Sequence, residues 1–143
     1  MTTANKIRIL IVDDHAMFRR IVSSILKPYP NIEVVGEASD GDEAIVSVGQ
    51  LKPDVILMDV SMQKMDGVTA ARLIKVQYPE VAILGLSAKA KHYDIYAIHK
   101  AGAFEALSKN NRFRNCMLRS REPWRPSNRC SSVKKRLPQM QHK

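Results

Sequence analysis

Cysteine is scarce in this chain: only Cys116 and Cys130 occur among 143 residues, and neither belongs to a Cys-X-X-Cys pair. This scarcity argues against a disulfide framework and against a cysteine-rich zinc site. The chain also lacks any apolar run near the roughly 18 residues that a membrane-spanning helix needs. Its first apolar run, residues 9–12, stops at Asp13 and Asp14, unlike the apolar segment of a secretory signal peptide. We therefore expect a cytoplasmic protein without a membrane span.

Acidic residues are almost missing from the end of the chain. Residues 1–109 contain 13 Lys/Arg and 13 Asp/Glu, whereas residues 110–143 contain 10 Lys/Arg and only Glu122. The whole net charge of +9 therefore comes from the second segment. Apolar residues are also unevenly distributed, with 55 among the first 109 residues and 9 among the last 34. This division predicts a neutral folded unit followed by a basic, unpacked tail.

Histidines with metal-ligand spacing are missing as well. The four histidines are His15, His92, His99 and His142. The interval of seven between His92 and His99 has no acidic or cysteine partner, so a surface helix is the favoured interpretation. We predict no metal site built on histidine.

Strand-like and helix-like patterns alternate over the first 109 residues. Short apolar runs predict strands at residues 7–12, 32–35, 55–58, 81–86 and 103–107. Apolar residues at helical spacing predict helices around residues 18–26, 44–51, 68–78 and 89–101, with a short final helix at about 111–121. This alternation is typical of an α/β protein with a parallel sheet covered by helices on both faces.

Charged and polar residues follow the predicted strands. Asp13-Asp14, Asp59, Ser87 and Lys109 come at the ends of four of them, and the carboxyl ends of parallel strands meet at one edge, where ligands bind. Two carboxylates about 4 Å apart repel by about 4 kcal/mol at an effective dielectric near 20, so three of them need a cation. Oxygen ligands favour Mg²⁺. Asp59 can then act as a nucleophile toward a phosphoryl group whose charge Lys109 and the metal neutralise.

These residues, together with residues 59–67 (Asp-Val-Ser-Met-Gln-Lys-Met-Asp-Gly), resemble the receiver domain of response regulators in two-component signalling. The resemblance covers roughly residues 6–109. It implies a flavodoxin-like (CheY-like) doubly wound five-stranded parallel sheet with strand order 2-1-3-4-5. It also implies transfer of a phosphoryl group from a partner histidine kinase. Residues 14–19 and 34–38 look most like the NarL/LuxR-type subfamily, which carries a helix-turn-helix output domain and regulates transcription.

The resemblance implies a role for each residue of a phosphoacceptor and metal site. Asp59 matches the phosphoacceptor, and Asp14 matches the direct Mg²⁺ ligand. Asp13 matches the carboxylate that holds a metal-bound water. The backbone carbonyl of Ser61 matches the remaining protein ligand of the metal.

The remaining matches concern charge neutralisation and switching. Lys109 matches the lysine that pairs with the phosphoryl group, and Ser87 matches the hydroxyl that turns inward to bond it. Two positions depart from the family pattern: Gln63 stands where proline is usual, and Ala106 stands where Tyr or Phe is usual. Because Phe104 is two residues before Ala106, we expect it on the same strand face, where it can partly replace the missing aromatic.

These considerations predict a receiver domain over residues 1–122 and a basic, disordered tail over residues 123–143. The 34 residues after Lys109 are too few for a helix-turn-helix output domain of about 60 residues, so we expect no such domain and no specific DNA binding. The sequence leaves open whether the chain forms a homodimer. We expect a signalling module and not an enzyme.

Two alternatives belong to other functional classes. A DNA-binding regulator can act through the basic tail, which offers many phosphate contacts. A Mg²⁺-dependent phosphohydrolase can turn over an aspartyl-phosphate, although such enzymes usually place a second aspartate where Ser61 stands.

Overall fold

The computed structural model describes residues 6–88 and 92–109. Within these residues, strands and helices alternate as follows: β1 (Ile7–Val12), α1 (Ala16–Leu26), β2 (Ile32–Ala38), α2 (Gly41–Leu51), β3 (Val55–Asp59), α3 (Gly67–Gln77), β4 (Ala82–Ser87), α4 (His92–Lys100) and β5 (Glu105–Ser108). The strands form one parallel sheet in the order β2-β1-β3-β4-β5, which confirms the predicted fold class. The helix predicted at about 111–121 and the tail predicted at 123–143 lie outside the described residues.

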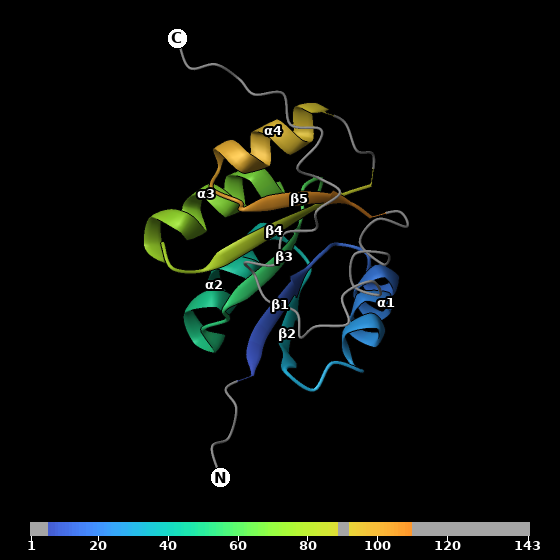
Figure 1. The fold of residues 1–143 in the computed structure, drawn as a ribbon. Coiled ribbons are helices and arrows are strands. Elements are labelled where there is room, and N and C mark those ends of the chain that lie inside the picture. Colours follow the sequence, from blue (N-terminus) through green and yellow to red (C-terminus); the bar gives the residue numbers. More distant parts are fainter. Residues whose placement is uncertain (1–5, 89–91, 110–143) are drawn as a thin grey trace.

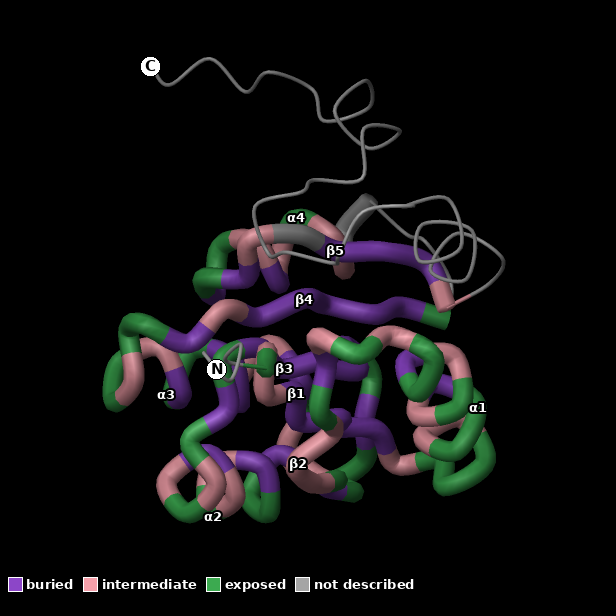
Figure 2. Tube along the Cα trace, turned by 60° about the horizontal axis from the view of Figure 1, so that its bottom comes forward, coloured by how far each residue is buried: buried purple, intermediate pink, exposed green. Residues whose placement is uncertain are grey.

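Helices cover both faces of the sheet. Figure 1 shows α1 on one side of the sheet and α2, α3 and α4 on the other. Successive strand residues point to opposite faces, so Leu10 and Ile56 pack under α2–α4, whereas Ile9 and Leu57 pack under α1. Figure 2 shows the central strands as continuously buried segments inside helices that are partly exposed. No helix in the described part of the chain is long and apolar enough to span a membrane.

Each face of the sheet has its own hydrophobic core. The α2–α4 core includes Leu10, Val12, Val48, Ile56, Met58, Ile74, Ile83 and Ile98. The α1 core includes Ile9, Ile11, Val22, Leu26, Val55, Leu57, Leu84, Leu86 and Leu107. Because strands β1, β3 and β4 contribute to both cores, their apolar runs are continuous instead of alternating with polar residues.

The strand predicted at residues 32–35 is longer than expected. It runs through Gly36 to Ala38, with a register shift where Ile9 pairs with Val34 and Leu10 pairs with Gly36. A Cβ atom at Gly36 would lie 2.5 Å from Leu51 Cδ1. This glycine therefore makes room for the end of α2 against the sheet and does not end the strand.

The prediction that Phe104 shares a strand face with Ala106 is wrong. Ala106 packs in the α2–α4 core with Ile98, whereas Phe104 packs against the α1 core, on the side of Leu107. The strand β5 begins only at Glu105, so the two-residue alternation of a strand does not extend back to Phe104. The phenyl ring of Phe104 thus lies on the opposite side of the sheet from the Ala106 methyl group.

Candidate functional site

Four residues of the predicted site lie at the carboxyl ends of parallel strands or directly after them, at one edge of the sheet. Asp13 comes directly after β1, Asp59 and Ser87 are the last residues of β3 and β4, and Lys109 comes directly after β5. Backbone hydrogen bonds align these ends: the amide of Lys109, for example, donates to the carbonyl oxygen of Ser87 at 2.7 Å. The parallel order of the strands therefore brings together residues that are far apart in the sequence.

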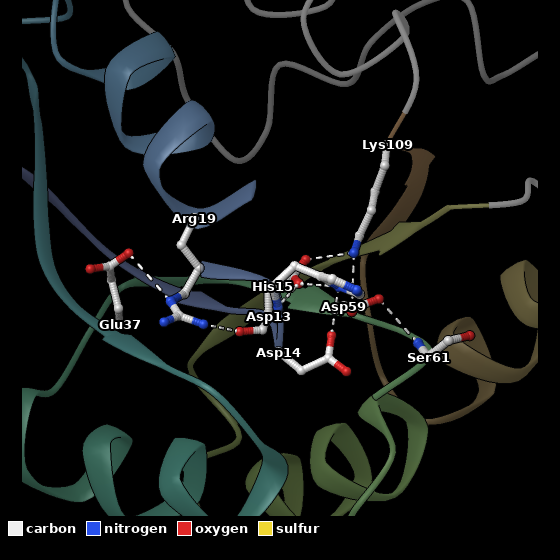
Figure 3. A network of polar contacts seen from close by, with 8 residues as sticks. All are labelled: Asp13, Asp14, His15, Arg19, Glu37, Asp59, Ser61 and Lys109. Carbon is white, nitrogen blue, oxygen red and sulfur yellow. Dashed lines mark hydrogen bonds and ion pairs between the residues drawn. The ribbon is translucent and has the colours of Figure 1, made fainter. Parts of the chain in front are cut away.

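Lys109 links the two buried carboxylates. Its Nζ lies 2.5 Å from Asp13 Oδ2 and 3.0 Å from Asp59 Oδ2 (Figure 3). Asp13 and Asp59 are each only 1% exposed, so water solvates neither carboxylate well. Among the described residues, Lys109 is the sole donor that reaches these two oxygens. One ammonium group therefore faces two buried carboxylates, which leaves excess negative charge.

This environment alters the acidity of Asp59. Burial and, second, the nearby charge of Asp13 raise the pKa of the Asp59 carboxyl, which reaches about 6 instead of 3.8. Hydrogen bonding and charge attraction from Lys109 oppose this rise, as does the Ser61 amide, which donates to Asp59 Oδ1 at 3.1 Å. The side chain is thus held at both oxygens, by Ser61 and by Lys109.

The loop after β1 is held by residues that the sequence did not identify as functional. The amide of His15 donates to Asp13 Oδ1 at 2.8 Å, and the guanidinium of Arg19 donates to the backbone carbonyl of Asp13. Arg19 Nε also lies 3.5 Å from Glu37 Oε1 on β2 (Figure 3). Arg19 therefore connects the end of β1, α1 and β2, and it fixes the backbone that carries the acidic pair. No spacing rule singles it out.

Four side chains at this edge can offer ligand atoms to one cation. One oxygen each of Asp13, Asp14 and Asp59 and one ring nitrogen of His15 all lie within 4.8 Å of one another. The buried Oδ2 atoms of Asp13 and Asp59, which among the described residues have Lys109 as their one donor, are suitable for a divalent ion. Carboxylate oxygens, which three of the four side chains offer, are also ligands that Mg²⁺ prefers. In the sequence, the position of His15 directly after Asp13 and Asp14 is the signal that could have identified it as a candidate ligand.

An aromatic ring supports the lysine. The Lys109 ammonium lies 4.6 Å from the ring centroid of Phe18, a geometry that attracts a cation to the negative face of the ring. Phe18 also packs against the α1 core, as its place in the predicted helical stripe implies. One side chain of α1 thus serves both the core and the site.

Ser87 approaches a different helix from the one that carries Phe18. Its hydroxyl lies 3.5 Å from a carboxylate oxygen of Asp94, near the start of α4. Ser87 is 2% exposed and lies in the same sheet edge as Asp59. A rotation of this hydroxyl would therefore change a contact with α4.

The loop between β3 and α3 packs tightly against the end of β3. The amide of Gly67 donates to the Val60 carbonyl, and a Cβ atom at Gly67 would lie 2.0 Å from the backbone oxygen of Asp59. Lys64 has a left-handed backbone with φ of 63°, and its ammonium lies 3.5 Å from Asp40 at the start of α2. The loop is therefore attached both to β3 and to α2, although it lacks the usual proline at residue 63.

The chain is similar in sequence to known proteins. The sequence-family model of the response regulator receiver domain matches residues 9–119. The response regulator protein VraR of Staphylococcus aureus is 45% identical over 96 residues, which cover 67% of this chain and 46% of VraR. The transcriptional regulatory protein LiaR of Bacillus subtilis is 40% identical over 106 residues, which cover 74% of this chain and 50% of LiaR. The chain thus spans about half the length of these relatives.

Solved structures agree with the sequence matches. The response regulator domain of Thermotoga maritima CheB superposes with a TM-score of 0.72 at 31% identity, covering 80% of this chain and 90% of that domain. The signal receiver domain of the response regulator NarL from Mycobacterium tuberculosis gives 0.71 at 30% identity, covering 80% of this chain and 98% of that domain. By sequence match and by fold, the chain belongs to the response regulator receiver family.

Proposed function

We propose that Asp59 accepts a phosphoryl group from a partner histidine kinase and that the resulting aspartyl-phosphate switches the domain between two conformations. The observation that supports this proposal is the fixed, buried carboxylate of Asp59, held by Lys109 at one oxygen and by the Ser61 amide at the other. Family membership supports the same reaction.

The chain's own residues would orient the nucleophile and neutralise charge. An oxygen of Asp59 attacks phosphorus, and the bond from phosphorus to the donor breaks as the donor leaves with the electron pair. Contacts with Ser61 and Lys109 hold the carboxyl plane, which lowers the entropic barrier to attack. The Lys109 ammonium, within reach of Asp13 and Asp59, stabilises the negative charge that the incoming phosphoryl group brings.

A divalent cation fits beside these residues. Asp13, Asp14, Asp59 and the backbone carbonyl of Ser61 would hold it, with Asp13 acting through a bound water. Mg²⁺ supplies positive charge to the phosphoryl oxygens when bound. Without a cation, the excess of buried carboxylate charge would repel an anionic phosphoryl donor.

Ser87 would transmit the change. After transfer its hydroxyl would bond the phosphoryl group and leave Asp94, which alters the start of α4. The small side chain of Ala106 offers no aromatic ring to follow that movement, so we assign the response to Ser87 and α4. We place the receiver at residues 1–122 and the basic tail at 123–143, in the cytoplasm, with transcription as the output that the relatives' names suggest.

Intact mass after incubation with acetyl phosphate tests this proposal. We expect one phosphoryl adduct that requires Mg²⁺ and disappears in Asp59→Asn. Asp42→Asn is the matched control, because Asp42 is an exposed aspartate on α2 outside the site. An adduct that persists in Asp59→Asn, or none in the unaltered chain, would contradict the proposal. Repeated release of phosphate, many times per protein molecule, would instead indicate a phosphohydrolase.

A further inference from the structure

His15 gives the acidic site a ligand that Mg²⁺ does not need. Its Nδ1 lies 2.9 Å from Asp14 Oδ1 and 3.3 Å from Asp13 Oδ1. The ring is 72% exposed, so it lies at the open side of the site, whereas Asp13 and Asp59 are buried. Mg²⁺ takes oxygen ligands, while imidazole is a preferred ligand of later first-row ions such as Co²⁺, Ni²⁺ and Zn²⁺.

We infer that this site also takes a first-row transition ion, with the His15 ring nitrogen as a direct ligand alongside Asp13, Asp14 and Asp59. The inference rests on the cation site of the proposed function and concerns which cations that site selects. It adds a nitrogen donor to the three carboxylates that suffice for Mg²⁺. Because the two kinds of cation share the same carboxylates, one displaces the other.

The spacing of the donor atoms supports a shared ion. The four candidate atoms lie within 4.8 Å of one another. Two ligands at about 2.1 Å from one ion are at most about 4.2 Å apart, so the widest spacing has to close slightly. The exposed His15 ring is free to rotate into place, whereas the Asp13 and Asp59 side chains are already fixed.

The charge balance independently indicates that a cation binds here. Asp13 and Asp59 are each 1% exposed, and their Oδ2 atoms have Lys109 as their sole donor among the described residues. Asp14 adds a third carboxylate whose buried Oδ1 has the His15 ring beside it. Lys109 is thus one ammonium group beside three carboxylates, and His15 and these carboxylates together form a donor set for a cation.

Calorimetric titration of the full chain with Co²⁺ and separately with Mg²⁺ tests the inference. Co²⁺ and Mg²⁺ differ in their affinity for carboxylate oxygens even without a histidine ligand, so the informative quantity is the change in each affinity caused by substitution. In His15→Gln we expect the affinity for Co²⁺ to fall by about tenfold or more. Loss of a residue that only orients a metal ligand already lowers metal affinity by about tenfold, and loss of a direct ligand should lower it at least as much. The affinity for Mg²⁺ should stay unchanged, and the visible absorption of bound Co²⁺ should shift.

Two control variants make the outcome specific. Asp14→Asn should weaken both cations, because it removes a shared carboxylate. His99→Gln should weaken neither, because His99 lies on α4 and contacts the Ala103 carbonyl. Equal weakening of Co²⁺ and Mg²⁺ in His15→Gln, or no weakening of either, would overturn the inference. If the Mg²⁺-dependent adduct on Asp59 nevertheless forms, the proposed function stands; if no cation binds at all, both fail.

Discussion

The middles and the carboxyl ends of β1 and β3 are equally buried but opposite in chemistry. Ile9 and Leu57, in the middles, are each 1% exposed, and so are Asp13 and Asp59 at the ends. Burying an apolar side chain of this size contributes about 1.5–3 kcal/mol to stability. Burying a carboxylate costs free energy, and the raised pKa of Asp59 expresses that cost. The same strands thus stabilise the fold along their length and destabilise it where they end.

The unfavourable free energy of burying carboxylates at the strand ends is consistent with a site that binds charged partners. Lys109 offsets part of the repulsion between Asp13 and Asp59, and a bound cation would offset more. Such a site is less stable when empty than an apolar one of the same shape. Substitutions in the two regions should therefore affect stability in opposite directions and affect phosphoryl transfer very differently.

The largest expected effect is the loss of stability on shortening a buried strand residue. Leu57→Ala should lower the free energy of unfolding by about 2–5 kcal/mol, because it removes buried methyl groups and leaves a cavity in the α1 core. The Leu57 side chain lies outside the site, so the folded fraction should still accept a phosphoryl group at Asp59. Urea unfolding and intact mass measure the two effects.

Val76→Ala is the control for this substitution. Val76 is 78% exposed on α3, and its truncation should change stability by no more than about 0.5 kcal/mol. A similar loss of stability in both variants would contradict the assignment of Leu57 to a packed core.

The next effect concerns the charged end of β3 and depends on pH. The pKa of Asp59 is raised to about 6 in the folded chain, above its ordinary value of 3.8, so the folded state binds this proton more tightly than the unfolded state does. The stabilising contribution is complete below about pH 4 and is lost as the pH rises through about 6. The loss amounts to about 3 kcal/mol, at about 1.4 kcal/mol per unit of difference in pKa.

Asp59→Asn isolates this contribution from the other carboxyl groups. The pKa of Asp40 is lowered chiefly by a hydrogen bond from the Glu43 amide, and the pKa of Glu43 is lowered chiefly by one from the Ser39 amide. The contributions of Asp40 and Glu43 to stability therefore increase with pH, opposite to that of Asp59. They remain in both proteins. In the absence of divalent cations, the difference in stability between wild type and variant should therefore change between about pH 4 and about pH 7.5. A difference that is constant with pH would refute the raised pKa.

Most of the fold could be predicted from the sequence because it depends on local patterns. Five apolar runs and the helical stripes between them give the elements, and residues at the ends of the strands give Asp13, Asp59, Ser87 and Lys109. The order of the strands came from the family resemblance, since alternation alone permits several topologies. Local patterns also explain the error at Phe104, because its face depends on where β5 begins and not on its distance from Ala106.

Contacts that depend on side-chain direction could not be predicted in the same way. In the sequence, Phe18 is one of several apolar residues on a helix, and nothing in that pattern indicates that its ring lies beside the Lys109 ammonium. Arg19 bonds a backbone carbonyl, for which sequence spacing gives no signal. His15 had a signal, its position next to two aspartates, but a histidine without a second histidine or cysteine did not meet the usual spacing rule.

The smallest expected effect concerns the junction between the two regions, where α3 packs against the end of β3. Gly67→Ala should lower the free energy of unfolding by about 1–3 kcal/mol, because the new methyl group would lie 2.0 Å from the Asp59 backbone oxygen and the backbone has to move. This displacement should also slow phosphorylation of Asp59, which Leu57→Ala should not do.

Gly49→Ala is the matched substitution, also a glycine within a helix. There the added methyl group would meet the Tyr78 hydroxyl, the far end of a side chain that can rotate away. Because alanine favours a helix by up to about 1 kcal/mol over glycine, this variant should be as stable as the wild type or more so. Both substitutions improve helix propensity. A loss of stability confined to Gly67→Ala would therefore show that β3 and α3 are in rigid contact. Equal effects would mean that the end of β3 adjusts freely, and the geometry around Asp59 would then depend on its ligands more than on the fold.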